Sequence, residues 1–345
     1  MNCMRDKTDL LQALGEWPIT PKGISPYKDV YKVDAEEGIY CLKQVDKKTR
    51  RALALEGVLE HLVAEKFTLT AKPHHNNAGR LLSQIRPGVH YILTDWVQGR
   101  SPDFRKFDAD IVGAAATLAL FHNASCGYVP PPGGKLRSRL SRWPTRLISR
   151  LREVVRLREE LNHKLFLDNF DRAFLQYYPW ILDRAEQGLQ IFTTPQYDDL
   201  VKTARRNNSF CHGDVAQRNF IVGDQGGYYI IDLDLVRRDT KAADLYKLFR
   251  DVTKKRRWDF TAAQLILQGY SKITPLKADE LAVLYGFLCY PHKIIHLILR
   301  YYVKREGKSR GWSTSKFIEK LHELGKRHPM ENALLQAFRS EYKIS

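Results

Sequence analysis

The sequence has few cysteines, and they are scattered. Its 345 residues include five, at Cys3, Cys41, Cys126, Cys211 and Cys289, with no CxxC pair among them. Disulfide scaffolds and structural zinc sites need paired cysteines at short spacing. We therefore expect neither a disulfide framework nor a zinc site, and we expect synthesis in a reducing cytoplasm.

Long apolar runs are also missing. The longest lies near residues 111–121, well short of the ~20 residues that cross a bilayer as a helix. Residues 1–17 carry charges throughout and lack the apolar core of a secretory signal. The sequence has no internal repeat and no low-complexity segment. We expect no membrane span and no secretory signal.

Acidic residues are scarce beside basic ones. The chain has 56 Lys and Arg against 39 Asp and Glu, a formal net charge of +17. Hydrophobic residues make up 43% and charged residues 28%, which is a globular composition. The charge predicts attraction to a polyanion, whether nucleic acid, an anionic surface or phosphate groups, without choosing among them.

The periodicity of apolar residues changes near residue 100. Before it, residues 29–33 and 38–45 predict a hairpin, residues 48–66 a helix and residues 89–97 a strand. After it, the segments with helical spacing are 108–123, 136–188 and 242 to the end. A small β-rich part is thus joined near residues 97–101 to a larger, mostly helical part. The prediction is an α+β fold in two lobes.

One segment in the helical part carries recognisable chemistry. Residues 211–219 read Cys-His-Gly-Asp-Val-Ala-Gln-Arg-Asn, which places Asp214 five residues before Asn219. A short apolar strand, a glycine-rich turn and a second strand follow, ending at Asp232. A hairpin brings its two ends together, so these three side chains should converge. Mg²⁺ prefers oxygen ligands of this kind, and phosphoryl transfer needs a carboxylate near the attacking hydroxyl. The plainer alternative is an Asx-turn loop that only caps the hairpin.

This segment resembles the catalytic and metal-binding loops of the aminoglycoside phosphotransferase and choline kinase group, which shares the protein-kinase-like fold. The resemblance implies that Asp214 is the catalytic base, that Asn219 is a magnesium ligand and that Asp232 is the main magnesium ligand. Leu-Asp stands after Asp232 where protein kinases have Phe-Gly. No Lys follows two residues after Asp214, which argues against a conventional protein kinase.

The same resemblance predicts a nucleotide site and a division into lobes. Lys43 lies on a predicted strand, where a lysine that binds the α- and β-phosphates belongs, and Glu56 on the next helix could hold it, with Glu60 as the alternative. The backbone at Asp95 and Val97 would contact adenine. Residues 1–96 would form the N-lobe and nucleotide lid, 97–101 the hinge and 102–345 the C-lobe, with an insert at about 135–205. The phosphate loop is poor, because residues 19–33 contain one glycine and no GxGxxG.

A closer resemblance covers almost the whole chain. Residues 15–43, 91–101, 118–132, 210–254 and 290–302 resemble the CotS-type spore-coat proteins of endospore-forming bacilli, including the YsxE branch. The likeness is most specific in residues 211–219 and in the Ile-Asp-Leu-Asp-Leu-Val of residues 231–236. It implies synthesis in the mother-cell cytoplasm, a place in the spore coat and other coat proteins as partners.

Two basic runs remain. Residues 135–158 hold nine Lys and Arg against one Glu, and residues 237–257 hold nine against three Asp. Solvated helix faces would explain both. Arg139, Arg142, Arg146 and Arg150 would form a stripe on one helix, although Pro144 restricts the firm part to the last two. In the resembled fold this insert lies near the acceptor, so the arginines suit an anionic acceptor or an acidic coat protein.

These observations support three readings. In the leading one, a kinase-like phosphotransferase uses ATP and Mg²⁺ to phosphorylate a hydroxyl of a small molecule or a protein. In the second, a coat protein keeps the fold as a scaffold with little or no turnover. In the third and weakest, the chain is an anion-binding module for nucleic acid, although no helix-turn-helix, RNP or zinc-knuckle pattern is present.

Overall fold

The computed structural model describes residues 2–46, 49–305 and 312–344. Residue 48, the expected start of the first predicted helix, lies outside this part. The described chain forms two compact units. The first unit holds residues up to 138, 204–239 and 265–275, and the second holds residues 139–203, 240–264 and 276 onward. The lobe boundaries at residues 96 and 101 stay a prediction.

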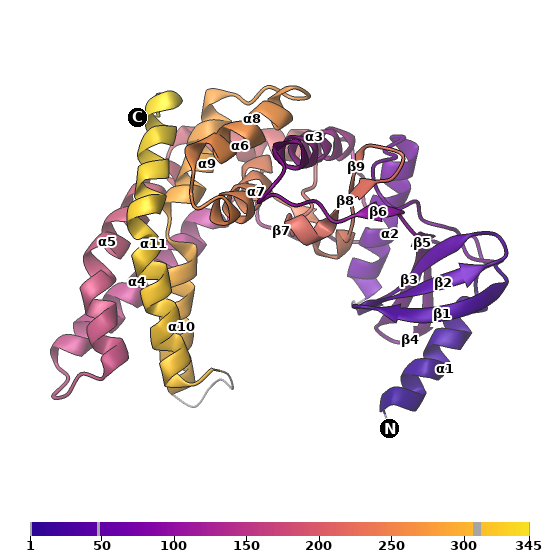
Figure 1. Ribbon diagram of the computed structural model, residues 1–345, viewed down its shortest axis with the longest axis horizontal. Coiled ribbons are helices and arrows are strands. Elements are labelled where there is room, and N and C mark those ends of the chain that lie inside the picture. Colours follow the sequence, from indigo (N-terminus) through magenta and orange to yellow (C-terminus); the bar gives the residue numbers. More distant parts are fainter. Residues whose placement is uncertain (1, 47–48, 306–311, 345) are drawn as a thin grey trace. The chain divides into compact units, whose positions relative to one another are not determined.

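The first unit contains the strands and the helices α1, α2 and α3 (Figure 1). Its elements are α1 (Asn2–Leu14), β1 (Pro21–Tyr27), β2 (Val30–Ala35), β3 (Ile39–Asp46), α2 (Thr49–Ala64), β4 (Leu82–Arg86), β5 (Val89–Asp95), β6 (Gly99–Arg100), α3 (Asp108–Ala124), β7 (Arg137–Ser138), the 3-10 helix η1 (Gln217–Asn219), β8 (Phe220–Gly223), β9 (Tyr228–Ile230), the 3-10 helix η2 (Leu233–Leu235) and β10 (Arg237–Arg238). The predicted hairpin, strand and helices of this unit are therefore confirmed.

Five of these strands form one antiparallel sheet in the order β1-β2-β3-β5-β4. Val33 on β2, Leu42 on β3 and Leu93 on β5 are fully buried, and the strand registers place them on one face of the sheet. They join a core cluster with the end of α1 and with Trp17. The sequence had given no sign of α1, β1 or β4 as elements. The sheet fixes β3, and with it Lys43, as a rigid support.

Helix α3 anchors the β8–β9 hairpin. The Thr117 hydroxyl donates to the carbonyl oxygen of Tyr228 at 2.8 Å, and the Tyr228 hydroxyl donates to Asp110 Oδ1 at 3.0 Å. Gly113 allows this approach, since a Cβ there would lie 2.0 Å from the Tyr228 ring. Arg100 donates two hydrogen bonds to the buried Asp110 carboxylate, at 2.7 and 2.8 Å. Burial alone would raise the pKa of Asp110, but the arginine outweighs it and the pKa is lowered.

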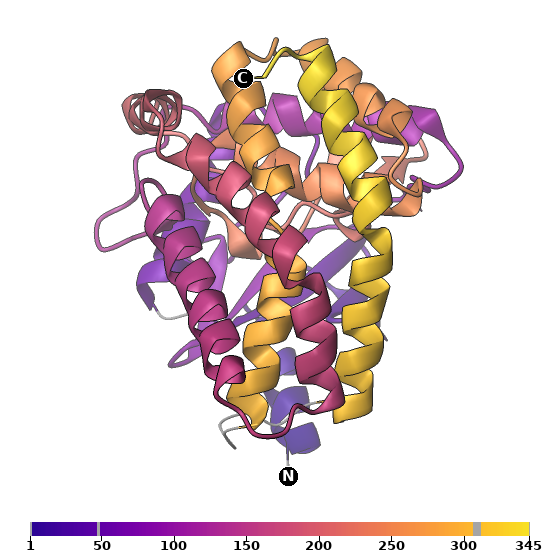
Figure 2. The ribbon, with the colours of Figure 1, turned by 90° about the vertical axis from the view of Figure 1, so that its left-hand side faces the viewer.

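The second unit is helical, as expected for most of the chain after residue 136. Its elements are α4 (Trp143–Asn162), α5 (Asn169–Phe192), most of α6 (Pro195–Arg206), α7 (Lys241–Lys255), the start of α8 (Phe260–Ser271), α9 (Ala278–Cys289), α10 (His292–Arg305) and α11 (Thr314–Glu341). Helices α4, α5, α10 and α11 lie side by side (Figure 2). Helix α4 begins at Trp143, so Pro144 lies in its first turn, where proline is tolerated. Arg139 and Arg142 precede the helix, and only Arg146 and Arg150 share a helical stripe.

One stretch of the second unit is long and apolar enough to cross a membrane. Residues 278–303, which are α9 and α10, have a mean hydropathy of 1.4 in their most apolar window, and 67% of that window is buried inside the protein. The core helices of soluble proteins pass the same test, so this is weak evidence for a membrane span.

Candidate active site

The residues of the predicted site lie in the first unit, on β3, on the loop before β8 and directly after β9. The loop depends on Gly213, which has a φ of 83° and whose Cβ position would lie 2.1 Å from the carbonyl oxygen of Leu235. His212 braces it. The Asp214 N–H donates to His212 Nδ1 at 3.2 Å, so Nε2 carries the proton and donates to the Ile231 carbonyl oxygen at 2.9 Å. The loop is thereby fixed to the chain just before Asp232.

Asn219 connects the loop that carries Asp214 to Ile231, the residue before Asp232. Its Nδ2 donates to the Asp214 carbonyl oxygen at 2.7 Å and to Asp214 Oδ2 at 3.3 Å. Its own carbonyl oxygen accepts the Ile231 N–H at 2.9 Å. The side chain is 3% exposed. Because the amide nitrogen is committed to Asp214, the side-chain oxygen is the atom that could serve a metal.

Asp232 and Asp234 converge on Lys43. Asp232 has a left-handed backbone, with a φ of 68°, and the η2 turn follows it. Lys43 Nζ lies 2.5 Å from Asp232 Oδ1 and 3.1 Å from Asp234 Oδ2. A left-handed non-glycine residue costs about 1–3 kcal/mol and is common at functional sites. The strand, the turn and the strained residue thus direct two carboxylates at one point.

Burial and charge compete at this point. Burial would lower the pKa of Lys43, but the charges of Asp234 and Asp232 and their hydrogen bonds outweigh it, and the pKa is raised. Burial would also raise the pKa of Asp232, but Lys43 outweighs it, with smaller effects of His212 and Arg218, and the pKa is lowered. Lys43 and Asp232 are therefore both ionised at neutral pH.

The oxygen atoms at this point suit a divalent cation. Asp232 and Asp234 offer two carboxylates there, and Asn219, whose backbone carbonyl accepts the Ile231 N–H, offers an amide oxygen. These are hard ligands of the kind Mg²⁺ takes. The ammonium of Lys43 already lies between the two carboxylates. A positive charge is thus stable there, and the residues fit the metal that the resemblance implies.

The sequence analysis did not predict two charged residues of this site. Arg218 Nη2 lies 2.5 Å from Asp214 Oδ2, and Asp234 shares Lys43 with Asp232. Each had a signal in its spacing. Arg218 follows Asp214 by four residues across η1, and Asp234 follows Asp232 by two around the left-handed turn.

The expected pairing of Lys43 with Glu56 is wrong. The Glu56 carboxylate instead accepts hydrogen bonds from Arg80, from the Leu81 N–H at 2.9 Å and from the Leu82 N–H at 3.4 Å. Glu56 is 7% exposed. Its carboxylate lies beside the start of β4, where two backbone N–H groups need an acceptor. Glu60, the alternative partner of Lys43, binds His75 at 2.9 Å. Glu56 therefore fastens α2 to β4.

The proposed adenine contacts lie where β5 ends. The Asp95 carboxylate lies 2.5 Å from His74 Nε2, and its N–H donates to the Lys72 carbonyl oxygen at 2.9 Å. The N–H of Val97 has no hydrogen-bond partner within the described residues. The β1–β2 turn contains Lys28 and Asp29 and no glycine, consistent with the poor phosphate loop noted in the sequence. Adenine binding here stays a prediction.

Solved structures that resemble this chain include two phosphotransferases. The chain resembles an aminoglycoside phosphotransferase from Alicyclobacillus acidocaldarius with a TM-score of 0.81, 17% identity and 96% of each chain covered. It also resembles a spectinomycin phosphotransferase, solved with ADP and spectinomycin, with a TM-score of 0.62, 17% identity and coverage of 96% and 98%. Identities this low show the fold alone, and they confirm the two-lobed, protein-kinase-like α+β fold.

Curated relatives are spore-coat proteins of Bacillus subtilis. Spore coat protein S is 25% identical over 296 residues, which are 84% of this chain and 81% of that protein. Endospore coat-associated protein YutH is 24% identical over 194 residues, or 55% of its length. The expected resemblance to CotS-type coat proteins is confirmed, and the branch named by the family match is YutH. Residues 14–338 match the family described as "Spore coat putative kinase YutH", and the chain belongs to that family.

Proposed function

We propose that this protein is a spore-coat phosphotransferase that moves the γ-phosphoryl group of ATP to a hydroxyl. Asp214 orients or deprotonates that hydroxyl. Asn219 and Asp232 hold Mg²⁺, which neutralises charge on the phosphates when it is bound. Lys43 turns from the two carboxylates to the α- and β-phosphates, while the backbone at Asp95 and Val97 takes adenine. Catalysis is then mostly positioning and charge stabilisation.

One observation carries this proposal. Lys43 lies on one strand of the sheet, while Asp232 and Asp234 follow another hairpin nearly 190 residues later, yet all three meet within hydrogen-bonding distance. A loop that only capped a hairpin would not need a lysine from the sheet. Arg218 and Asn219 hold Asp214 on a loop that His212 ties to Ile231, the residue before Asp232, and this supports the proposed roles of a base, a metal site and a phosphate-binding lysine.

A thermal shift tests the nucleotide site without a known acceptor. ATP at tenfold its Kd should stabilise the protein by about 1.4 kcal/mol, and only when Mg²⁺ is present. Asp232→Ala should abolish the shift. Asp224→Ala is the matched control, because Asp224 is an exposed aspartate of the β8–β9 turn. The absence of any shift at millimolar nucleotide in the native chain would refute the enzyme.

The scaffold reading keeps one observation in its favour, the glycine-free β1–β2 turn. In that reading the chain assembles with other coat proteins and transfers nothing. An experiment with spores that carry Asp214→Ala distinguishes the enzyme from the scaffold. Normal incorporation of the variant with an unchanged pattern of coat phosphorylation favours the scaffold, and loss of specific phosphorylated species favours the enzyme.

A further inference from the structure

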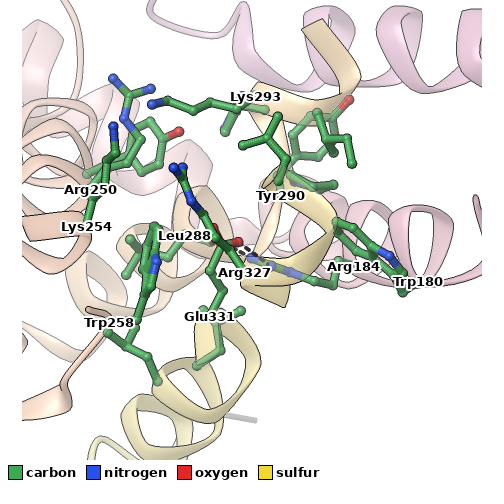
Figure 3. Close-up of a pocket in the computed structure, with 17 residues that line it drawn as sticks. Trp180, Arg184, Arg250, Lys254, Trp258, Leu288, Tyr290, Lys293, Arg327 and Glu331 are labelled. Carbon is green, nitrogen blue, oxygen red and sulfur yellow. Dashed lines mark hydrogen bonds and ion pairs between the residues drawn. The ribbon is translucent and has the colours of Figure 1, made fainter. Parts of the chain in front are cut away.

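The second unit encloses a cavity that the proposed function does not use. Its volume is about 60 Å³, and residues of α5, α7, α10 and α11 line it together with the segment after α9 (Figure 3). A water needs ~10–15 Å³ on this measure, so the cavity holds about four to six waters or one tetrahedral oxyanion. All of its lining residues belong to the second unit.

Positive side chains dominate the lining. Five cations, Arg184, Arg250, Lys254, Lys293 and Arg327, face one acid, Glu331. Glu331 is already used, because its Oε2 accepts from Arg184 Nη1 at 2.9 Å. The other Arg184 donors bind the carbonyl oxygens of the segment that ends α9, at 2.9 and 3.0 Å. Arg184 and Glu331 thus neutralise each other and build the wall.

The remaining cations are poorly compensated. Arg327 pairs with Glu323, which Lys320 also binds. Among the described residues, Arg250, Lys254 and Lys293 have no carboxylate partner. Figure 3 shows these three side chains reaching toward one another from α7 and α10. Like charges gathered without a counter-ion are unfavourable unless a ligand supplies the negative charge.

The pKa values of the cavity lysines reflect the positive charge around them. Partial burial and repulsion by Arg250, Lys254, Arg327 and Lys320 lower the pKa of Lys293 to about 8. Burial and the same kind of repulsion lower the pKa of Lys254. Burial, with repulsion from nearby arginines, lowers the pKa of His292 to about 3, so this residue adds no positive charge. With a pKa of about 8, Lys293 is still ionised at neutral pH, and the cavity is positively charged.

The wall is also held in a costly conformation. Arg257 and Trp258, directly after α7, have positive φ values of 53° and 65°. Two consecutive left-handed residues, one of them a tryptophan, are unusual and unfavourable. The Trp258 N–H donates to the Thr253 carbonyl oxygen at 2.7 Å, which fastens this turn to α7. The turn places Trp258 in the wall next to the cations.

We propose that this cavity binds the phosphate group of a small ligand, either inorganic phosphate or a small phosphomonoester. Arg250, Lys254 and Lys293 supply the charged contacts, and Arg327 adds a fourth positive group once the ligand is present. A cavity of about 60 Å³ has room for one phosphate group. This site is independent of the proposed kinase activity, since it uses none of the residues around Asp214 or Asp232.

Calorimetry on the full-length chain tests the proposal with two probes, inorganic phosphate and glycerol 3-phosphate. Either should bind the native protein. Lys254→Ala combined with Lys293→Ala should weaken binding by about tenfold or more, because two ionic contacts are lost. Asp232→Ala should bind as the native chain does. Tighter binding of glycerol 3-phosphate would identify a phosphomonoester, and tighter binding of inorganic phosphate would identify the free ion.

The matched control removes the same charge outside the cavity. Lys255→Ala combined with Lys272→Ala changes one lysine of α7 that pairs with Asp251 and one exposed lysine after α8. This variant should keep native affinity. Equal weakening in both double variants would show that net charge alone attracts the anion and would overturn the proposal. The absence of binding of either probe to the native protein at about 10 mM, where a Kd of a few millimolar would give substantial occupancy, would also overturn it.

Discussion

Two lysines, one in each unit, have opposite surroundings. Lys43 lies between two carboxylates, and its pKa is raised. Lys293 lies among Arg250, Lys254 and Arg327, and its pKa falls to about 8. Both side chains are partly desolvated, so the sign of the neighbouring charges decides the direction. One site has an excess of acid that suits a metal, and the other has an excess of base that suits an anion.

The comparison gives the net charge of +17 a more specific meaning. In the first unit the cations near the proposed site are paired, Arg218 with Asp214 and Arg80 with Glu56. In the second unit, part of the surplus gathers around one cavity. A single nucleotide needs only a few positive groups. We therefore interpret the part of the surplus that lies around the cavity as the binding charge for a second anionic ligand.

Replacing Lys43 should give the larger effect on stability. Lys43→Met leaves Asp232 and Asp234 partly buried and unpaired, and we expect it to cost about 1–3 kcal/mol in the free energy of unfolding. Denaturant unfolding measures the loss. Millimolar Mg²⁺ should stabilise this variant more than the native protein, because the carboxylates no longer have a cation. An equal effect of Mg²⁺ on both would contradict the metal site.

The pH dependence of anion binding should follow Lys293. Sulfate is a suitable probe, because its charge is constant from pH 6 to 10. The bound anion favours the protonated lysine, so affinity should be full below pH 8 and fall as pH rises through about 8, by up to tenfold per unit. Lys254 on α7 adds to this trend. Arg184, Arg250, Arg327 and Glu331 line the same cavity, and His292 is neutral throughout this range. A flat profile would contradict the site.

Replacing Lys293 should change the stability in the opposite direction. The pKa of Lys293 is about 8 in the folded chain against an ordinary 10.5, so protonation opposes folding and the penalty is complete below pH 8. Lys293→Met should raise the Tm at pH 7 without ligand, and this gain should vanish above about pH 10.5. A lower Tm at pH 7 would show that Lys293 is paired rather than repelled.

Local patterns carried most of the first site. His212, Asp214, Asn219 and Asp232 lie within 21 residues, and one hairpin brings them together. The predicted pairing of Glu56 with Lys43 was wrong because Glu56 instead binds Arg80 and two backbone N–H groups at the start of β4. No local spacing in the sequence reveals these contacts.

The second site was beyond sequence reasoning for the same reason. Its cations come from α5, α7, α10 and α11, so residues such as Arg184 and Arg327 are more than a hundred positions apart. The sequence showed the basic run at 237–257 but could not separate cavity residues from solvated ones. Lys254 and Lys255 are neighbours, yet one lines the cavity and the other pairs with Asp251.

A crystal structure with Mg²⁺ and AMP-PNP tests the central claim most directly. We predict metal contacts from Asp232 and Asn219, with Lys43 released from the carboxylates and bound to the nucleotide phosphates. Adenine should lie against the backbone at Asp95 and Val97. A structure in which Lys43 still joins Asp232 to Asp234, with no metal beside them and no nucleotide on the lysine, would contradict the account.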